Sequence, residues 1–239
     1  MSQRIKLYNL LLLFFLFIYF FLFNALFAIP LPPKTSNQKV NKENKLAEKQ
    51  TNTLKELLPD KSIAPNINGK IFYNKTDSLL TEENFVKKLQ THYVNYKNNI
   101  TVLVFWETQC GFCQLILPKL ELLHKKFASK GINFYAVNPK DLKLKNNLIS
   151  FFNKYKYSKV NLDENAQKIQ VEIDTTQNKE LTIPILFVDN TTQQNFLVTG
   201  FPTTYVIDEE GLVYTAMIGY FKEYDEWMSM LLNNMLITK

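Results

Sequence analysis

The feature that most constrains this chain is a pair of cysteines between a buried strand and an amphipathic helix. Residues 100–106 read ITVLVFW, an almost wholly apolar run typical of a central strand covered on both faces. The cysteines follow, and a helical apolar stripe then recurs at Phe112, Ile116, Leu120, Leu123 and Phe127. Gly131 ends this helix, and residues 132–137 form a second strand. The order predicts a right-handed parallel crossover with Cys110 at the helix amino terminus.

That position predicts reactive sulfur. A helix amino terminus has exposed N–H groups and a partial positive charge, and both favour thiolate over thiol. Cys110 is therefore expected to be the nucleophile. Cys113 lies one turn further along the same helical face, within reach to close a disulfide with Cys110. We read the pair as a redox dithiol, and we expect no other cofactor.

Other uses of the cysteines fit less well. The chain has two cysteines in all, and one short loop could not organise a disulfide-stapled scaffold of this length. A zinc site would need both cysteines with His92 and His124, whose separation matches no usual zinc-finger spacing. We expect no metal site, and we expect both histidines to be surface or hydrogen-bonded residues.

Residues 1–29 predict a membrane anchor. Residues 7–29 are almost unbroken Leu and Phe, and as a helix they would rise about 35 Å, enough to cross the lipid hydrocarbon. Arg4 and Lys6 precede them, as in a signal sequence. Cleavage after Ala28 would place Leu26 where a small residue is preferred, so we expect an uncleaved signal-anchor. A cleaved periplasmic form is the alternative. The lysines between residues 34 and 49 favour the opposite orientation, with these residues in the cytoplasm.

Residues 30–64 have the composition of a flexible polar linker, and residues 65–239 that of a globular domain. The net charge of +6 belongs mainly to the front of the chain. From residue 65 onward, nineteen lysines face eighteen acidic residues. A nucleic-acid-binding domain needs a basic folded surface, so nucleic acid is excluded as a partner.

A second motif follows further along, where residues 200–208 read GFPTTYVID. Gly211 supplies a turn between strands expected over 204–208 and 213–218, and an apolar helix is expected over 222–236. Together with Phe105-Trp106, the C-G-F-C sequence and Pro118, this motif resembles the thioredoxin superfamily. It is similar to the TlpA-like branch, the membrane-tethered thiol–disulfide oxidoreductases of bacterial cell envelopes.

The resemblance implies an α/β thioredoxin-like fold: a central mixed sheet flanked by helices, with the redox site at one end. It implies a cis peptide bond before Pro202, with that proline lying against the Cys110–Cys113 disulfide. It also implies that substrates bind around the two motifs, at Trp106, Gly111, Phe112, Phe201 and Pro202.

Several positions depart from the family pattern. Gln109 stands where thioredoxins usually have Trp, and Gln114 where a basic residue is usual. The buried acids of relatives would fall at Val104 or Ile116, both apolar here. Thr203 replaces the acid typical of relatives specialised for cytochrome c maturation, so that subtype is not supported. These departures predict slow release of a mixed disulfide, because no carboxylate stands ready to take the proton of Cys113.

The stretch between the two motifs is longer than a minimal thioredoxin needs, so an inserted element is expected there. A helix is expected over 143–156 and a strand over 183–188. Between them, Ile169, Val171 and Ile173 alternate as in a strand. Leu162, Ala166, Ile169 and Ile173 also fit a helix, which we favour.

The function expected from these observations is an anchored thiol–disulfide oxidoreductase, acting as a reductase on cysteines of exported proteins. It would sit in the bacterial inner membrane through residues 7–29, with its domain in the periplasm. Because the chain has no second cysteine pair, a separate membrane electron donor would re-reduce it. A disulfide isomerase or envelope assembly factor is one alternative. A non-catalytic tethered binding module with a structural disulfide is another.

Overall fold

The computed structural model describes residues 57–74, 80–139, 141–155, 158–163, 168–173 and 181–238. The expected anchor at residues 7–29 and most of the expected linker lie outside these ranges. In the part of the chain that is described, no helix is long and apolar enough to cross a membrane.

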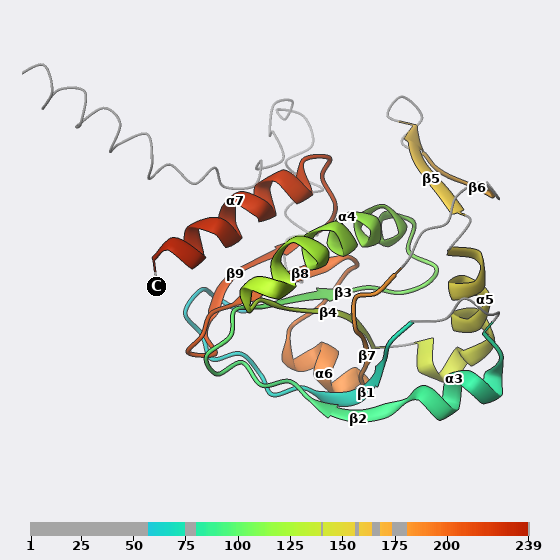
Figure 1. Ribbon diagram of the computed structural model, residues 1–239, viewed down its shortest axis with the longest axis horizontal. Helices are drawn as coiled ribbons and strands as arrows, with labels where there is room; N and C mark the ends of the chain where they lie inside the picture. Colours follow the sequence, from blue (N-terminus) through green and yellow to red (C-terminus); the bar gives the residue numbers. More distant parts are fainter. Residues whose placement is uncertain are drawn as a thin grey trace, which may run out of the picture. The chain divides into compact units, whose positions relative to one another are not determined.

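A seven-stranded mixed sheet forms the centre of the unit that comprises residues 43–225 (Figure 1). Its strands lie in the order β2-β1-β7-β4-β3-β8-β9. Their bounds are β1 Asn68–Phe72, β2 Gln90–Tyr93, β3 Thr101–Phe105, β4 Asn133–Asn138, β7 Ile185–Phe187, β8 Thr203–Ile207 and β9 Val213–Ile218. Strands β3, β4 and β7 are parallel to one another, and the other neighbours are antiparallel. The thioredoxin-like arrangement expected from the sequence is confirmed.

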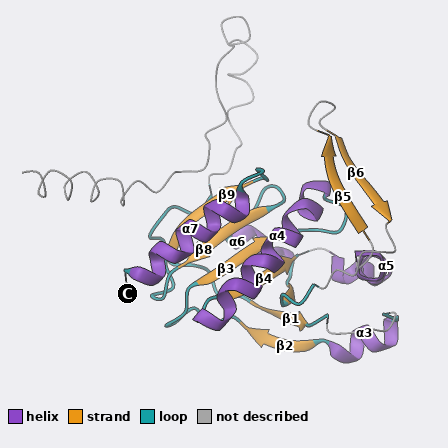
Figure 2. Ribbon diagram, turned by 45° about the horizontal axis from the view of Figure 1, so that its top comes forward, coloured by secondary structure: helices purple, strands orange, loops and turns teal. Residues whose placement is uncertain are grey.

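Helices lie on both faces of this sheet. Helix α4 (Gly111–Phe127) covers one face and α6 (Asn190–Asn195) the other (Figures 1 and 2). The remaining helices are α3 (Glu82–Lys88), η2 (Asp141–Leu144), α5 (Lys145–Tyr155) and the carboxy-terminal α7 (Tyr224–Ile237), which from Glu226 belongs to a second unit. The expected helices over 143–156 and 222–236 are confirmed as α5 and α7.

Strand β3 is buried on both faces of the sheet. Every side chain of β3 is buried. Leu103 and Phe105 join the cluster of apolar side chains that includes Phe196, at the end of α6. Val102 and Val104 therefore point to the opposite face, on which α4 lies. This double burial is why the strand reads as a continuous apolar run.

The crossover from β3 to β4 follows the expected order of strand, helix and strand, but Phe112 is more exposed than expected. Helix α4 ends in a short 3-10 turn, η1 (Ala128–Lys130), and Gly131 adopts the left-handed conformation, with φ +83°. Ile116, Leu120, Leu123 and Phe127 are buried as expected, but Phe112 is 44% exposed. The prediction that Phe112 belongs to the buried stripe is wrong, because Cys113 instead occupies the first buried position of the helix.

The inserted element is a β-hairpin, and the helix that we favoured for it is wrong. Strands β5 (Ser158–Asp163) and β6 (Lys168–Ile173) pair antiparallel as a separate two-stranded sheet. The alternation of Ile169, Val171 and Ile173 was the correct signal, because β-branched residues at a period of two favour strands. The hairpin lies beside α4, with β5 the nearer strand (Figures 1 and 2).

The globular domain begins earlier than the expected boundary at residue 65. Leu57 and Leu58 pack against the core cluster, and the backbone N–H of Leu58 donates to the Tyr205 hydroxyl at 3.3 Å. The N–H of Lys61 donates to the carbonyl of Val213 at 2.7 Å. Residues 57–64, which we had assigned to the linker, are therefore part of the domain.

A buried carboxylate on α4 holds the segment just before β7. Glu121 is 5% exposed, and it accepts hydrogen bonds from the backbone N–H and hydroxyl of Thr182 and from the N–H of Ile183, at 2.6–2.9 Å. Lys125 lies 3.4 Å from the same carboxylate. These contacts fix the chain where it returns from the inserted hairpin to the sheet.

Glu121→Ala should lower the free energy of unfolding by about 3 kcal/mol, because one buried and two part-buried donors would lose their acceptor, at about 1–3 kcal/mol for a fully buried one. Glu83→Ala is the matched control. Its side chain is 78% exposed in an ion pair with Lys87, and its loss should cost less than about 1 kcal/mol. Urea unfolding of both variants measures the difference, and equal losses would contradict the assigned role of Glu121.

Candidate functional site

The two cysteines lie where α4 begins, and they form a disulfide with a Cα–Cα distance of 5.2 Å. Cys110 is the N-cap of the helix, and the backbone N–H of Cys113 points at its sulfur, with an N–Sγ distance of 3.1 Å. The first turn of α4 contains no acidic residue to neutralise the helix amino terminus. The fold thus places Cys110 where a thiolate would receive a charge-assisted hydrogen bond.

The two cysteines differ in how far they are exposed to solvent. Cys110 is half-buried, whereas Cys113 is completely buried. An incoming disulfide can therefore meet Cys110 but not Cys113. That Cys110 attacks and Cys113 resolves stays a prediction, to be tested with the serine variants of each.

Backbone contacts hold the loop between β3 and α4. The N–H of Cys110 donates to the carbonyl of Glu107 at 3.3 Å. The side-chain amide of Gln114 donates to the carbonyl of Thr108 at 3.3 Å, tying the first turn of the helix back to the loop. The sequence marked Gln114 only as a departure from the family pattern, whereas the structure shows that it braces the loop.

The motif around Pro202 lies beside the cysteine loop because its strand, β8, pairs with β3. The peptide bond between Phe201 and Pro202 is cis, as expected. Strand β8 runs antiparallel to β3 with Thr203 opposite Phe105, so Pro202 lies level with the start of the cysteine loop. The Thr203 hydroxyl donates to the carbonyl of Gly200 at 2.7 Å, which closes the turn before the strand. Phe201 is half-buried and packs against the core cluster.

A third segment, Gly219–Asp225, completes the site, and we did not predict it. The N–H of Gly219 donates to the carbonyl of Pro202 at 2.7 Å. The ring of Tyr220 stacks on Phe112, with centroids 6.2 Å apart and an interplanar angle of 24°. The only local signal was Gly219 itself, whose φ of +97° suits glycine.

The remaining predicted site residues lie in different environments. Gly111 is half-buried in the first turn of α4. Trp106 is completely buried, and its ring packs against Phe151 with centroids 5.1 Å apart. Its indole nitrogen has no hydrogen-bond partner within the ranges that the structure describes. A completely buried ring presents no surface to a substrate, so the prediction that Trp106 binds substrate is wrong.

The surroundings of Cys113 are apolar, as the sequence indicated. Val104 and Ile116 are completely buried. Glu121, on the same helix as Cys113, uses its carboxylate to hold Thr182 and Ile183. Among the residues that the structure describes, no group of three His, Cys, Asp or Glu side chains could hold a metal ion.

The two histidines lie outside the cysteine loop. His92 Nε2 is 3.0 Å from the Tyr135 hydroxyl, so it has the partner that we expected. His124 Nδ1 is buried and has no hydrogen-bond partner among the described residues, so the same prediction is wrong for this nitrogen; the ring meets Phe134 edge-on at 5.8 Å. Burial lowers the pKa of both imidazoles, which favours their neutral forms.

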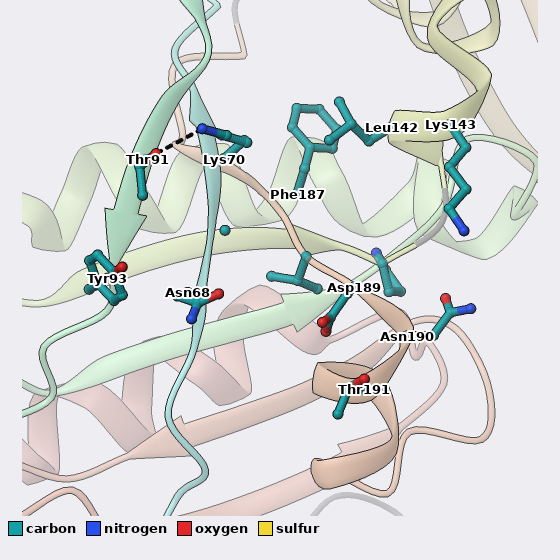
Figure 3. A pocket seen from close by; sticks show the side chains of 13 residues that line it. Asn68, Lys70, Thr91, Tyr93, Leu142, Lys143, Phe187, Asp189, Asn190 and Thr191 are labelled. Atoms are coloured by element: carbon teal, nitrogen blue, oxygen red, sulfur yellow. Dashed lines mark hydrogen bonds between the residues drawn. The ribbon is translucent and has the colours of Figure 1, made fainter.

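A cavity of about 640 Å³ opens at the same edge of the sheet but beside other strands (Figure 3). It lies among β1, β2 and the segments that follow β4 and β7, and Asp189, Asn190 and Thr191 line one side of it. Neither cysteine and none of the other predicted site residues lines it. Of the two bonded cysteines, Cys110 is the half-buried one that another protein could reach.

Comparisons with known proteins agree with this fold and site. The family model described as the AhpC/TSA family matches residues 79–216, more than half of the 239-residue chain. A thioredoxin-like protein of Bacillus subtilis, YneN, is 26% identical over 127 residues. This match covers 52% of the chain and 58% of the relative, so the chain spans little more than half of that protein.

Two solved structures show the same fold. One, from Chlorobium tepidum, is named as a thiol:disulfide interchange protein DsbE, with a TM-score of 0.50 and 18% identity over 75% of this chain and 99% of that one. The other, from Bacteroides thetaiotaomicron, is named as a protein disulfide isomerase, with a TM-score of 0.50 and 14% identity over 75% of this chain and 91% of that one. At these identities the likeness concerns the fold, whereas the match to the family model covers most of the domain. The chain belongs to the AhpC/TSA family.

Proposed function

We propose that this protein is a membrane-tethered thiol–disulfide oxidoreductase that reduces disulfides of exported proteins. The observation that carries the proposal is the half-buried Cys110 at the N-cap of α4, joined to the buried Cys113. This placement favours thiolate at the sulfur that a substrate can reach, and it keeps the second sulfur within bonding distance.

The reaction is a two-step exchange. In the reduced protein, the Cys110 thiolate attacks one sulfur of the substrate disulfide, and the other substrate sulfur leaves as a thiolate that takes a proton. Cys113 then loses its proton and attacks Cys110, which releases the first substrate sulfur. Two electrons pass to the substrate, and the protein is left with its Cys110–Cys113 disulfide.

A partner must return these electrons, because the chain has no other cysteine. We propose a membrane dithiol protein as this donor. The direction of transfer follows the TlpA-like resemblance, and the isomerase and assembly-factor alternatives share the same first step. They differ in the second step, because an isomerase returns its substrate with a rearranged disulfide rather than with free thiols.

The chemistry can be tested with the purified full-length protein, a reducing dithiol and a peptide disulfide. We expect catalytic formation of peptide thiol, and rapid alkylation of a single thiol of the reduced protein by a maleimide at neutral pH. Slow alkylation with no turnover would instead support a binding module with a structural disulfide.

The tether is a separate part of the proposal, supported by the apolar run at residues 7–29 and the two basic residues before it. Alkaline phosphatase fused after Lys239 should be active in a bacterial host, because the enzyme needs an oxidising compartment. The fusion protein should also stay with the membranes after a carbonate wash. An inactive fusion would place the domain in the cytoplasm, as the lysines after the run suggest.

A further inference from the structure

The segment Gly219–Asp225 runs from β9 across the start of α4, and contacts at both of its ends hold it in place. At one end, Gly219 bonds to the carbonyl of Pro202. At the other, the ammonium group of Lys119 on α4 donates to the carbonyl of Lys222 at 2.8 Å and pairs with Asp225. These contacts hold the backbone on both sides of Tyr220, whose ring stacks on Phe112.

Deeper contacts support the same segment. The Phe221 ring meets Tyr224 edge-on, with centroids 5.9 Å apart. Tyr224 is completely buried, and its hydroxyl lies 3.3 Å from the hydroxyl oxygen of Thr204 on β8. Burial raises the pKa of Tyr224, so its hydroxyl stays protonated and able to hydrogen-bond. The segment is thus joined both to α4 and to the strand that follows Pro202.

Tyr220 and Phe112 together form an apolar surface beside the disulfide, which we call the aromatic platform. Phe112 is 44% exposed although Tyr220 stacks on it, so part of its ring faces solvent. Ile218 is 47% exposed, and its methyl group Cγ2 lies 3.7 Å from the Cβ position that a side chain at Gly200 would have. Phe112 belongs to the first motif, and Gly219, next to Tyr220, bonds to Pro202 of the second, so the platform adjoins both motifs of the site.

We propose that Tyr220 is a specificity-determining residue, and that the platform selects disulfides in which an aromatic or large aliphatic residue adjoins the target cysteine. This inference rests on the function proposed above. The target sulfur must bond to Cys110, and successive residues of an extended chain are about 3.5 Å apart. A neighbour of the target cysteine then falls on Phe112, two residues from Cys110.

The chemistry of the platform explains why the neighbour should be apolar. Phe112 and Tyr220 are uncharged, so the two rings themselves hold no charge that could pair with a charged neighbour, and Lys119 is engaged by Asp225. A flat ring held against Phe112 instead gives a third ring a prearranged place to stack. Tyr220 does not touch the reacting sulfurs in this account, and it acts by holding the Phe112 ring.

The test uses two short peptides whose cysteine forms a mixed disulfide with 2-nitro-5-thiobenzoate, with either Phe or Ser just before that cysteine. With the full-length reduced protein in excess, release of the coloured thiol in a single turnover measures the second-order rate constant for each peptide, and the protein ends with its Cys110–Cys113 disulfide. The unmodified protein should prefer the Phe peptide by about 3- to 10-fold, as expected for one added aromatic contact. The preference should lie mainly in the protein concentration that gives half the maximal rate, and not in the maximal rate itself, because the contact forms on binding.

Tyr220→Ser should bring this preference close to one, whereas Tyr220→Phe should retain it because the ring remains. Tyr214→Ser is the matched control. Tyr214 is 38% exposed on β9, at the end of the strand away from Pro202, and its replacement should leave both rates unchanged.

Three outcomes would overturn the inference: no preference in the unmodified protein, a full preference in Tyr220→Ser, or an equal fall of both rates in Tyr220→Ser. The last would make Tyr220 a merely structural residue. Failure to turn over either peptide would instead overturn the proposed oxidoreductase function.

Discussion

Cys110→Ser should reduce the rate of disulfide exchange by at least about a thousandfold, as the loss of a catalytic nucleophile does in other enzymes. Serine at the N-cap still caps the helix, so the fold and its stability should change little. The missing group is the half-buried sulfur at which the N–H of Cys113 points. Turnover of a peptide disulfide by the full-length variant measures the loss.

Cys113→Ser should behave differently, because the attacking sulfur remains. The variant should form a mixed disulfide with the substrate and then stall, since no second sulfur can release it. Mass spectrometry of the quenched reaction would show the covalent product for Cys113→Ser and none for Cys110→Ser. If Cys113 instead proves to be the thiol that alkylates faster, the two roles are inverted. In its native cells, the same variant would capture the physiological substrate.

The second large effect concerns the release step. Cys113 must lose a proton while completely buried, and burial disfavours the charged form of a thiol. Val104 and Ile116 contribute no carboxylate to take that proton. The carboxylate of Glu121 is occupied by Thr182 and Ile183. We therefore expect the mixed disulfide to persist at low pH.

Release should accelerate about tenfold for each pH unit over the range in which the thiol is protonated, because the thiolate fraction controls exchange. Stopped-flow measurement of peptide release across about pH 5–9 would cover this range around the usual thiol pKa. A flat profile would show that some other group already accepts the proton.

Val104→Asp tests the cause directly. The added carboxylate should speed release near neutral pH, and it should lower stability, because an acid enters an apolar site. Val102→Asp is the matched control: Val102 is equally buried on the same face of β3, two residues further from the cysteine loop. The control should lose stability without faster release. Equal acceleration in both variants would mean that looser packing, rather than a proton acceptor, causes the effect.

Much of this site was predictable because its determinants are local in sequence. Strand β3, the first turn of α4 and the left-handed Gly131 depend on residue types a few positions apart. Capping, helical spacing and turn chemistry act over that range. The same holds for the hairpin of β8 and β9, whose turn includes Gly211, with φ +83°. The cis bond before Pro202 was predicted from family resemblance, not from local physics.

The sequence by itself thus determined the strand–cysteine–helix unit, and with it the placement of Cys110 at a helix amino terminus. Only the tertiary structure decided what surrounds that unit. Phe112 and Tyr220 are 108 positions apart in sequence, and Glu121 and Thr182 are 61 apart. Phe112 fits the helical stripe, yet it lies outside the buried face, while Trp106 is buried entirely. The physical reason is that burial depends on which distant segments pack together, and the periodicity of one segment does not contain that information.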